Sequence, residues 1–268
     1  MDTTALPAAT NPQRAHAADR APPHQAAPPP PPTSASPPAG PPPDFARQRP
    51  QTLPSGASYT LSTTPAHDGA HLASIYCVAL FPSAPPSLVF DLLTHPGACA
   101  AGVWRDVKAL NERLVESEAA PGAGGDPPGS RGVRSVLVTQ VGEVRLAIKT
   151  LRFETHLRVV EDGRGAGAGA YATHFSLARP GGALRRFHGT WALAADEAGT
   201  GTAALLTQEV CPAGVPPGLN NVPVIGRLVR GACSRAVRRM VEDLAGALDG
   251  VEKGAGGVDA WIESRTTM

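Results

Sequence analysis

One long amphipathic segment near the end of the chain constrains the fold more than any other feature. Between Val222 and Leu248 the apolar residues recur at intervals of three and four, at Ile225, Leu228, Val229, Ala232, Ala236, Val237, Met240, Leu244, Ala247 and Leu248. This spacing is typical of a helix with a single apolar stripe. Pro223 suits the first turn and Gly250 suits the end. Such a helix would be roughly 40 Å long, and it needs a sheet against which to bury its stripe.

The middle of the chain predicts that sheet. Ser74 to Phe81 forms a strand, after which Pro86 opens a short helix with Ser83 as a candidate cap, and a second helical turn follows around Ala98. Six strands at hairpin spacing come next, and a change of phase between residues 148 and 151 indicates a turn or bulge. Strands joined by short loops form an antiparallel sheet, which coils as it twists. The long helix would then lie across the concave face, leaving a cavity between them.

Composition divides the chain into a folded domain and two tails. About half of the 29 prolines lie before position 51, so we expect residues 1–69 to be a disordered Pro/Ala-rich tail. Pro28 to Pro32 favours polyproline II; it is either a docking segment for a partner protein or, as we prefer, a stiff linker. Because this tail contains arginines, an organellar transit segment is an alternative function for it. We expect the folded domain at 70–250 and a flexible tail at 251–268.

Composition and charge also exclude several classes of function. The net charge is +1 without a basic patch interleaved with aromatics, which argues against a nucleic-acid partner. No apolar run approaches the ~20 residues of a spanning helix, and no secretion signal precedes the domain. The four cysteines show no C-x-x-C and no metal-like spacing with histidine, and no pair among His156, His174 and His188 has a ligand spacing, so no metal or cofactor is predicted. We expect an intracellular monomer, cytoplasmic or in a plastid or mitochondrion.

Five segments carry a resemblance to a known family: Val78-x-x-Phe81-Pro82, Val89 to Thr94, Trp104 to Val107, Phe187 to Trp191 and Leu206 to Val210. Together with the order of one strand, two short helices, six strands and one long helix, they resemble the START-like (SRPBCC) superfamily. The nearest likeness is to its polyketide cyclase/dehydrase and coenzyme-Q-binding START-type branch. The resemblance covers about residues 70–248. It implies an α+β helix-grip fold, a curved antiparallel sheet wrapped around a long C-terminal helix, whose cavity holds a lipid, isoprenoid quinone, polyketide or hormone.

The candidate ligand-binding residues lie on the expected inner faces: Phe153, Phe175, Phe187, Gly189, Trp191, Gln208, Val229 and Met240. Gly189 between two rings on one strand face suggests space for a ligand, or plain core packing around a glycine. Gln208 shares the alternation of Leu206 and Val210, so its amide would point inward and need a partner, either a ligand or a neighbouring backbone group. No residue is assigned a catalytic role.

These observations predict binding or transport of a hydrophobic small molecule. One alternative is a polyketide cyclase/dehydrase-type enzyme with a Tyr, His or Arg as general acid or base. Another is a ligand-sensing module that closes its loops to bind a partner protein. The shortage of titratable residues on the inner faces favours binding over catalysis. Arginines of the long helix could make transient contact with anionic lipid headgroups, although Glu242 and Asp243 interrupt that patch and favour an ordinary solvated face.

Overall fold

The computed structural model describes residues 41–65, 73–119, 131–146, 149–179, 182–213, 223–254 and 256–267. All of them belong to one compact unit, Ala39–Met268. The candidate docking segment at Pro28 to Pro32 and most of the candidate transit segment lie outside the described residues. The elements are η1 Phe45–Arg47, β1 Gln51–Thr52, β2 Ser58–Thr64, β3 Ala73–Phe81, α1 Pro86–Thr94, β4 Val107–Ala119, β5 Val133–Leu146, β6 Lys149–Asp162, η2 Arg164–Ala168, β7 Tyr171–Leu177, β8 Leu184–Ala195, β9 Thr202–Pro212, α2 Pro223–Lys253 and α3 Gly257–Thr266.

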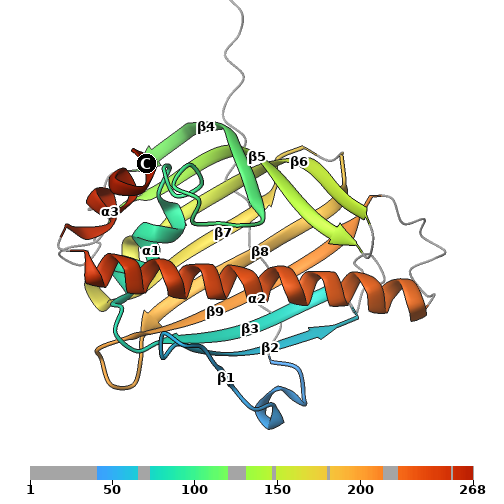
Figure 1. Cartoon of the computed structure of the whole chain (residues 1–268), viewed down its shortest axis with the longest axis horizontal. Helices are drawn as coiled ribbons and strands as arrows, with labels where there is room; N and C mark the ends of the chain where they lie inside the picture. The colour runs from blue at the N-terminus through green and yellow to red at the C-terminus, as the bar shows by residue number, and fades with distance from the viewer. Residues whose placement is uncertain are drawn as a thin grey trace, which may run out of the picture. The chain divides into compact units, whose positions relative to one another are not determined.

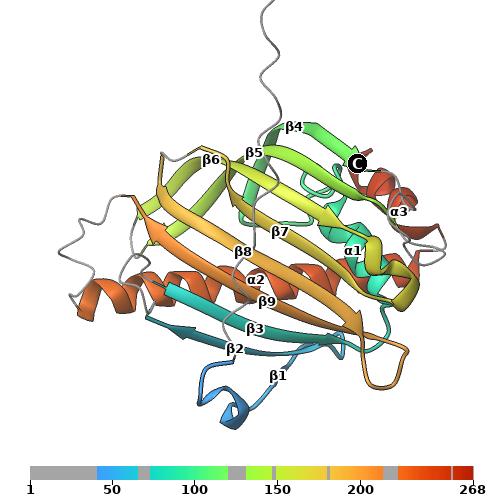
Figure 2. The same ribbon diagram turned by 180° about the vertical axis from the view of Figure 1, so that it is seen from behind.

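A single antiparallel sheet of nine strands forms the body of this unit, in the order β1-β2-β3-β9-β8-β7-β6-β5-β4. The last strand, β9, pairs with β3, the first strand of the predicted sheet. Helix α2 crosses one face of the sheet (Figure 1), and from behind the strands lie in front of it (Figure 2). We call the face covered by α2 the inner face. The predicted α+β helix-grip arrangement is therefore confirmed.

The apolar stripe of α2 explains why the helix lies on the sheet. Val237, Val241, Leu244 and Leu248 are buried in one core with inward residues of the strands. Helices α1 and α3 pack near the C-terminal end of α2 (Figure 1). The change of phase between residues 148 and 151 is the hairpin that joins β5 to β6, because the two strands pair from Leu146 and Lys149 onward.

The expected start of the domain at residue 70 needs correction. Strand β2, inside the segment assigned to the tail, pairs along its length with β3 and buries Tyr59 against the core. The sequence of β2 is rich in serine and threonine, which hid the alternation of Tyr59 and Leu61. The period of two that identifies a half-buried strand was present, but only two apolar residues marked it.

The expected C-terminal tail is likewise part of the folded unit. Helix α2 continues to Lys253, and α3 follows with Val258 and Ile262 buried in the main core. Two smaller expectations also differ from the structure. Residues 96–102 form turns instead of a second short helix, and α1 is preceded by Pro85 without a side-chain cap, so Ser83 does not cap it.

Candidate functional site

Strand register places six of the eight predicted site residues on the inner face. Residues paired across antiparallel strands project from the same side of a sheet. One row of such paired residues runs across four strands. It begins at Ile75, a core residue of β3, which pairs with Gln208 of β9. Gln208 pairs with Gly189 of β8, and Gly189 pairs with Phe175 of β7. The same alternation turns three further residues inward, Phe153, Phe187 and Trp191.

Only some of these residues are brought together. The rings of Phe175 and Phe187 are 5.2 Å apart between centroids, and both pack against the core together with Met240 of α2. The pairing of β6 with β7 ends at Leu157. Phe153 lies past that point on β6 and does not belong to the group of Phe175, Phe187 and Met240. Val229 is half-buried on the N-terminal half of α2. The sequence thus identified the correct face of the sheet, and the structure assembles a smaller aromatic group on it.

The space expected beside Gly189 is already filled. A Cβ atom at Gly189 would lie 2.5 Å from Cζ of Phe175 and 2.5 Å from the backbone oxygen of Thr207. The ring of Phe175 therefore packs directly over its cross-strand glycine. A second pair repeats the pattern, because a Cβ at Gly142 would lie 2.9 Å from Cζ of its partner Phe153. Gly189 is a packing glycine that accommodates an aromatic ring.

The inner face has a closed half and an open half. In the closed half, toward α1 and α3, six large side chains are buried: Tyr171, Trp191, Leu193, Leu206, Leu244 and Leu248. In the open half several inward residues are only half-buried: Phe153, Phe175, Phe187, Gln208, Val229 and Met240. Ile75 and Val210 beside them are buried. Leu228 was expected to be buried with Leu244, but it is 51% exposed, and Val224 is 72% exposed. Both residues lie on the side of α2 that faces away from the sheet, nearly opposite the buried Val237 and Leu244. In the N-terminal half of α2, residues 223–236, Gly226 is buried and Cys233 packs against the core, whereas Val229 is only half-buried.

A separate hollow of about 670 Å³ lies on the opposite, outer side of the sheet. Its side chains come from outward positions of adjacent strands, among them Val78 of β3, Ala192 of β8 and Leu205 of β9. This apolar outer surface was not predicted from the sequence. The hollow is the competing location for a hydrophobic ligand.

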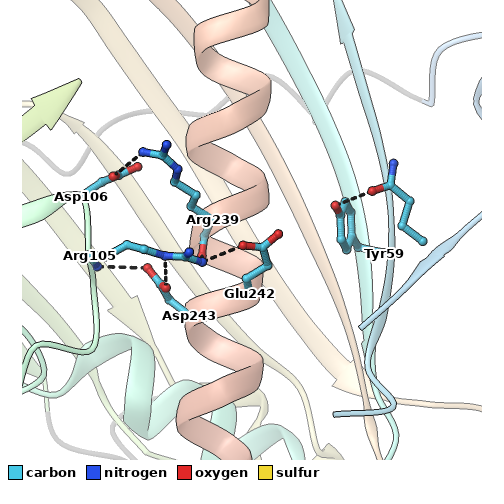
Figure 3. A network of polar contacts seen from close by, with 7 residues as sticks. Tyr59, Arg105, Asp106, Arg239, Glu242 and Asp243 are labelled. Carbon is cyan, nitrogen blue, oxygen red and sulfur yellow. Dashed lines mark hydrogen bonds and ion pairs between the residues drawn. The ribbon is translucent and has the colours of Figure 1, made fainter. Parts of the chain in front are cut away.

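A network of charged residues attaches α2 to the loop that precedes β4 (Figure 3). Arg105 donates from Nε to Asp243 at 2.6 Å and from Nη2 to Glu242 at 2.7 Å, and Arg239 donates to Asp106 at 3.0 Å. Burial raises the pKa of Asp243 despite the hydrogen bonds from Arg105. The carboxylates of α2 thus pair mainly with Arg105 across the fold rather than with arginines one helical turn away. This network secures the C-terminal part of α2.

A buried charged cluster on β4 to β7 was missed by the sequence analysis. Glu161 of β6 is 4% exposed and accepts hydrogen bonds from Arg113 of β4 at 2.5 Å and from Nε of Arg134 of β5 at 2.7 Å. Thr173 of β7 pairs with Glu161, and its hydroxyl is buried without a described hydrogen-bond partner. A signal was available, because Glu161 continues the inward alternation of Leu157 and Val159.

The histidines of the sheet face outward. His174 pairs through Nδ1 with the hydroxyl of Thr190 at 2.9 Å, and His188 lies 3.2 Å from Glu209, all at positions that alternate with the inner-face residues. Within the described ranges, no group of three or more His, Cys, Asp or Glu side chains could hold a metal ion. None of the described helices is long and apolar enough to cross a membrane.

The chain was compared with known proteins. No family model matches it, and no curated protein matches it. Similar solved structures include the Zhui aromatase/cyclase from Streptomyces sp. R1128, with 14% identity, coverage of 69% of this chain and 98% of that chain, and a TM-score of 0.43. The lipid transfer and protein localization domain of human StarD13 has 13% identity, coverage of 69% and 84%, and a TM-score of 0.43. Human STARD10 has 12% identity, coverage of 81% of each chain, and a TM-score of 0.43.

Proposed function

We propose that the protein binds a hydrophobic small molecule on the open half of the inner face, beneath the N-terminal half of α2. The observation that carries this proposal is the half-exposed pair of Phe175 and Phe187, whose ring centroids lie 5.2 Å apart. Met240 of α2 is partly buried against the same core as these rings, and Val229 of the same helix is half-buried. Apolar surfaces of a helix and a sheet that face each other without close packing can both be covered by one ligand.

The composition of this surface favours a largely apolar ligand, such as a lipid, an isoprenoid quinone or a polyketide-like molecule. Each 100 Å² of apolar ligand surface removed from water would contribute about 2.5 kcal/mol to binding. The thioether of Met240 adapts to ligands of different shape. Gln208 supplies one uncharged polar group that could orient a carbonyl or hydroxyl.

An enzyme of the polyketide cyclase/dehydrase type is the alternative. General acid–base catalysis would need a titratable group directed at the ligand. His174 and His188 face outward, and Tyr171 is buried in a stack with Phe90 at 4.8 Å between ring centroids. These placements favour binding without chemistry at a histidine or tyrosine, and the inner-face arginines Arg113 and Arg134 are paired with Glu161. A ligand-sensing module would begin with the same binding step, so one experiment addresses both.

Uptake of a fluorescent fatty acid by two alanine variants tests the proposal. Phe187→Ala should reduce uptake about tenfold, because it removes one ring of the half-exposed Phe175–Phe187 pair. Leu205→Ala is the matched control, since Leu205 is a half-buried apolar residue of the outer hollow. It should leave uptake unchanged. The opposite pattern, with loss of uptake only in Leu205→Ala, would assign the ligand to the outer hollow and refute the inner-face site.

We also propose transient contact of the N-terminal half of α2 with a membrane surface. Val224, Leu228 and Arg227 are exposed on this half of the helix. Exposed apolar side chains beside a cation are typical of helices that lie on anionic lipid. Leu228→Ser should weaken sedimentation with phosphatidylserine vesicles without lowering the melting temperature. Equal sedimentation of both proteins would exclude this surface.

A further inference from the structure

The inner face carries a second chemical feature beside its aromatic group, namely the charged cluster of Arg113, Arg134, Glu161 and Thr173. Glu161 lies in one cross-strand row between Thr173 of β7 and Arg134 of β5. Arg113 reaches the same carboxylate from β4, at the edge of the sheet (Figure 1). Four consecutive strands therefore contribute to one polar site on an otherwise apolar face.

The cluster contains more positive than negative charge. Two guanidinium groups oppose one carboxylate, so the cluster carries +2 − 1 = +1. The side chains of Glu161 and Arg113 are only 5% and 15% exposed, whereas that of Arg134 is 35% exposed, so water reaches the cluster mainly at Arg134. A buried charge is usually compensated by a partner of opposite sign. An anionic group bound at the cluster would supply that compensation.

The geometry of the arginines leaves donors for such a group. Within the cluster, Glu161 is contacted by Nη2 of Arg113 and by Nε and Nη2 of Arg134. Each guanidinium carries five N–H donors spread over three nitrogen atoms. The donors on the remaining nitrogen atoms are not used by Glu161. A planar guanidinium presents paired donors that match the two oxygens of a carboxylate.

Thr173 provides an independent observation. Its side chain is 7% exposed, and its hydroxyl has no hydrogen-bond partner among the described residues. Buried hydroxyl groups are nearly always hydrogen-bonded in folded proteins. Because Thr173 lies opposite Glu161 on the neighbouring strand, its side chain projects from the same face of the sheet as the carboxylate that the arginines hold, and its hydroxyl could donate to the same anion.

The cluster is also well placed relative to the proposed ligand site. Thr173 and Phe175 point to the same face of β7 and are two residues apart, which is about 7 Å along a strand. Thr173 also pairs directly with Trp191 of β8. A ligand with its apolar part over Phe175 and Phe187 could therefore place a terminal group at Arg134 and Thr173.

We propose that this cluster binds the carboxylate of an amphipathic ligand, which identifies the ligand class as a long-chain or polycyclic carboxylic acid. This inference rests on the proposed binding function. The two arginines hold the anionic oxygens, Thr173 donates a further hydrogen bond, and the aromatic pair covers the apolar part. Glu161 positions the two arginines and does not itself contact the ligand.

Binding of three twelve-carbon probes by the full chain tests the assignment. The probes are dodecanoic acid, dodecan-1-ol and dodecyl phosphate, each below its micellar concentration at pH 7.5. Dodecanoate should bind at least about tenfold more tightly than dodecanol, because only the anion engages the arginines. Arg134→Met should reduce that preference to about twofold or less while dodecanol still binds. Thr173→Val should weaken dodecanoate binding about threefold or more without destabilising the fold, since it removes a hydroxyl that lacks a partner.

Arg158→Met is the matched control. Arg158 lies on the outer face of β6, where it donates to Glu116 at 2.9 Å, and its loss should leave the preference for dodecanoate intact. Equal binding of dodecanoate and dodecanol to the unmodified chain would overturn the carboxylate site and leave the proposed function standing. Tighter binding of dodecyl phosphate than of dodecanoate would also overturn it, in favour of a phosphate. Failure of all three probes to bind would refute the proposed function itself. If Arg134→Met does not fold, Thr173→Val decides the question.

Discussion

Replacing Gly189 with alanine should destabilise the protein more than any other glycine-to-alanine change on the inner face. The added Cβ would lie 2.5 Å from the ring of Phe175 and 2.5 Å from the backbone oxygen of Thr207, whereas ordinary contact begins near 3.4 Å. The ring could rotate away, but the oxygen belongs to the neighbouring strand β9 and can move only if the strands separate. Relief therefore requires a shift of backbone in the centre of the sheet.

Gly189→Ala should lower the free energy of unfolding by about 2–3 kcal/mol, the upper part of the range for overpacking a closed core. For a domain of this size, that lowers the melting temperature by roughly 5–10 °C. Gly142→Ala should cost less, because its close contact at 2.9 Å is with the side chain of Phe153, which can turn. Thermal unfolding followed by circular dichroism measures all of these variants.

Gly246→Ala is the control, for which we expect a rise instead of a fall in the melting temperature. Gly246 is an exposed residue of α2, and a Cβ there would meet nothing within 4 Å. Alanine in a helix should therefore stabilise the protein by about 0.5–1 kcal/mol. Equal melting temperatures for Gly189→Ala and the unmodified protein, with a measurable rise for Gly246→Ala, would show that the position beside Gly189 is open. The packing described for Phe175 would then be incorrect.

Three further predictions follow from burial. Leu244→Asp should prevent folding, because Leu244 is 0% exposed, whereas Leu228→Asp on the outward side of the same helix should change the free energy of unfolding by less than about 0.5 kcal/mol; similar losses would mean that α2 is packed differently. Removal of residues 1–72 should lower the melting temperature by several degrees, roughly more than 5 °C, because it deletes β2 with buried Tyr59; unchanged melting would show that β2 adds nothing. Burial raises the pKa of the Cys77 thiol to about 12, so it should resist a thiol reagent at pH 8 until the protein unfolds; rapid labelling of Cys77 in the folded protein would contradict its burial.

The periodic patterns of the sequence determined which residues face each other. Side chains alternate strictly along a strand and recur every 3.6 residues on a helix, so apolar residues at those periods identify the buried face without knowledge of the fold. This is why Phe187, Trp191 and Gln208 were placed on the correct side of the sheet, and why Leu244 was placed in the core. The helix-grip arrangement followed, because one long amphipathic helix and one curved sheet can bury their apolar faces only against each other.

Only the tertiary structure decided whether an inward position is filled, open or charged. The space at Gly189 depends on Phe175, a residue of another strand whose ring direction is not encoded in the local pattern. Only the structure shows which side of α2 faces the sheet: Leu244 is buried, whereas Leu228, on nearly the opposite side of the helix, is 51% exposed. The pairing of Arg113 with Glu161 joins residues 48 positions apart and depends on the register of β4, β5 and β6. Such contacts are set by strand order and curvature, which are properties of the whole sheet.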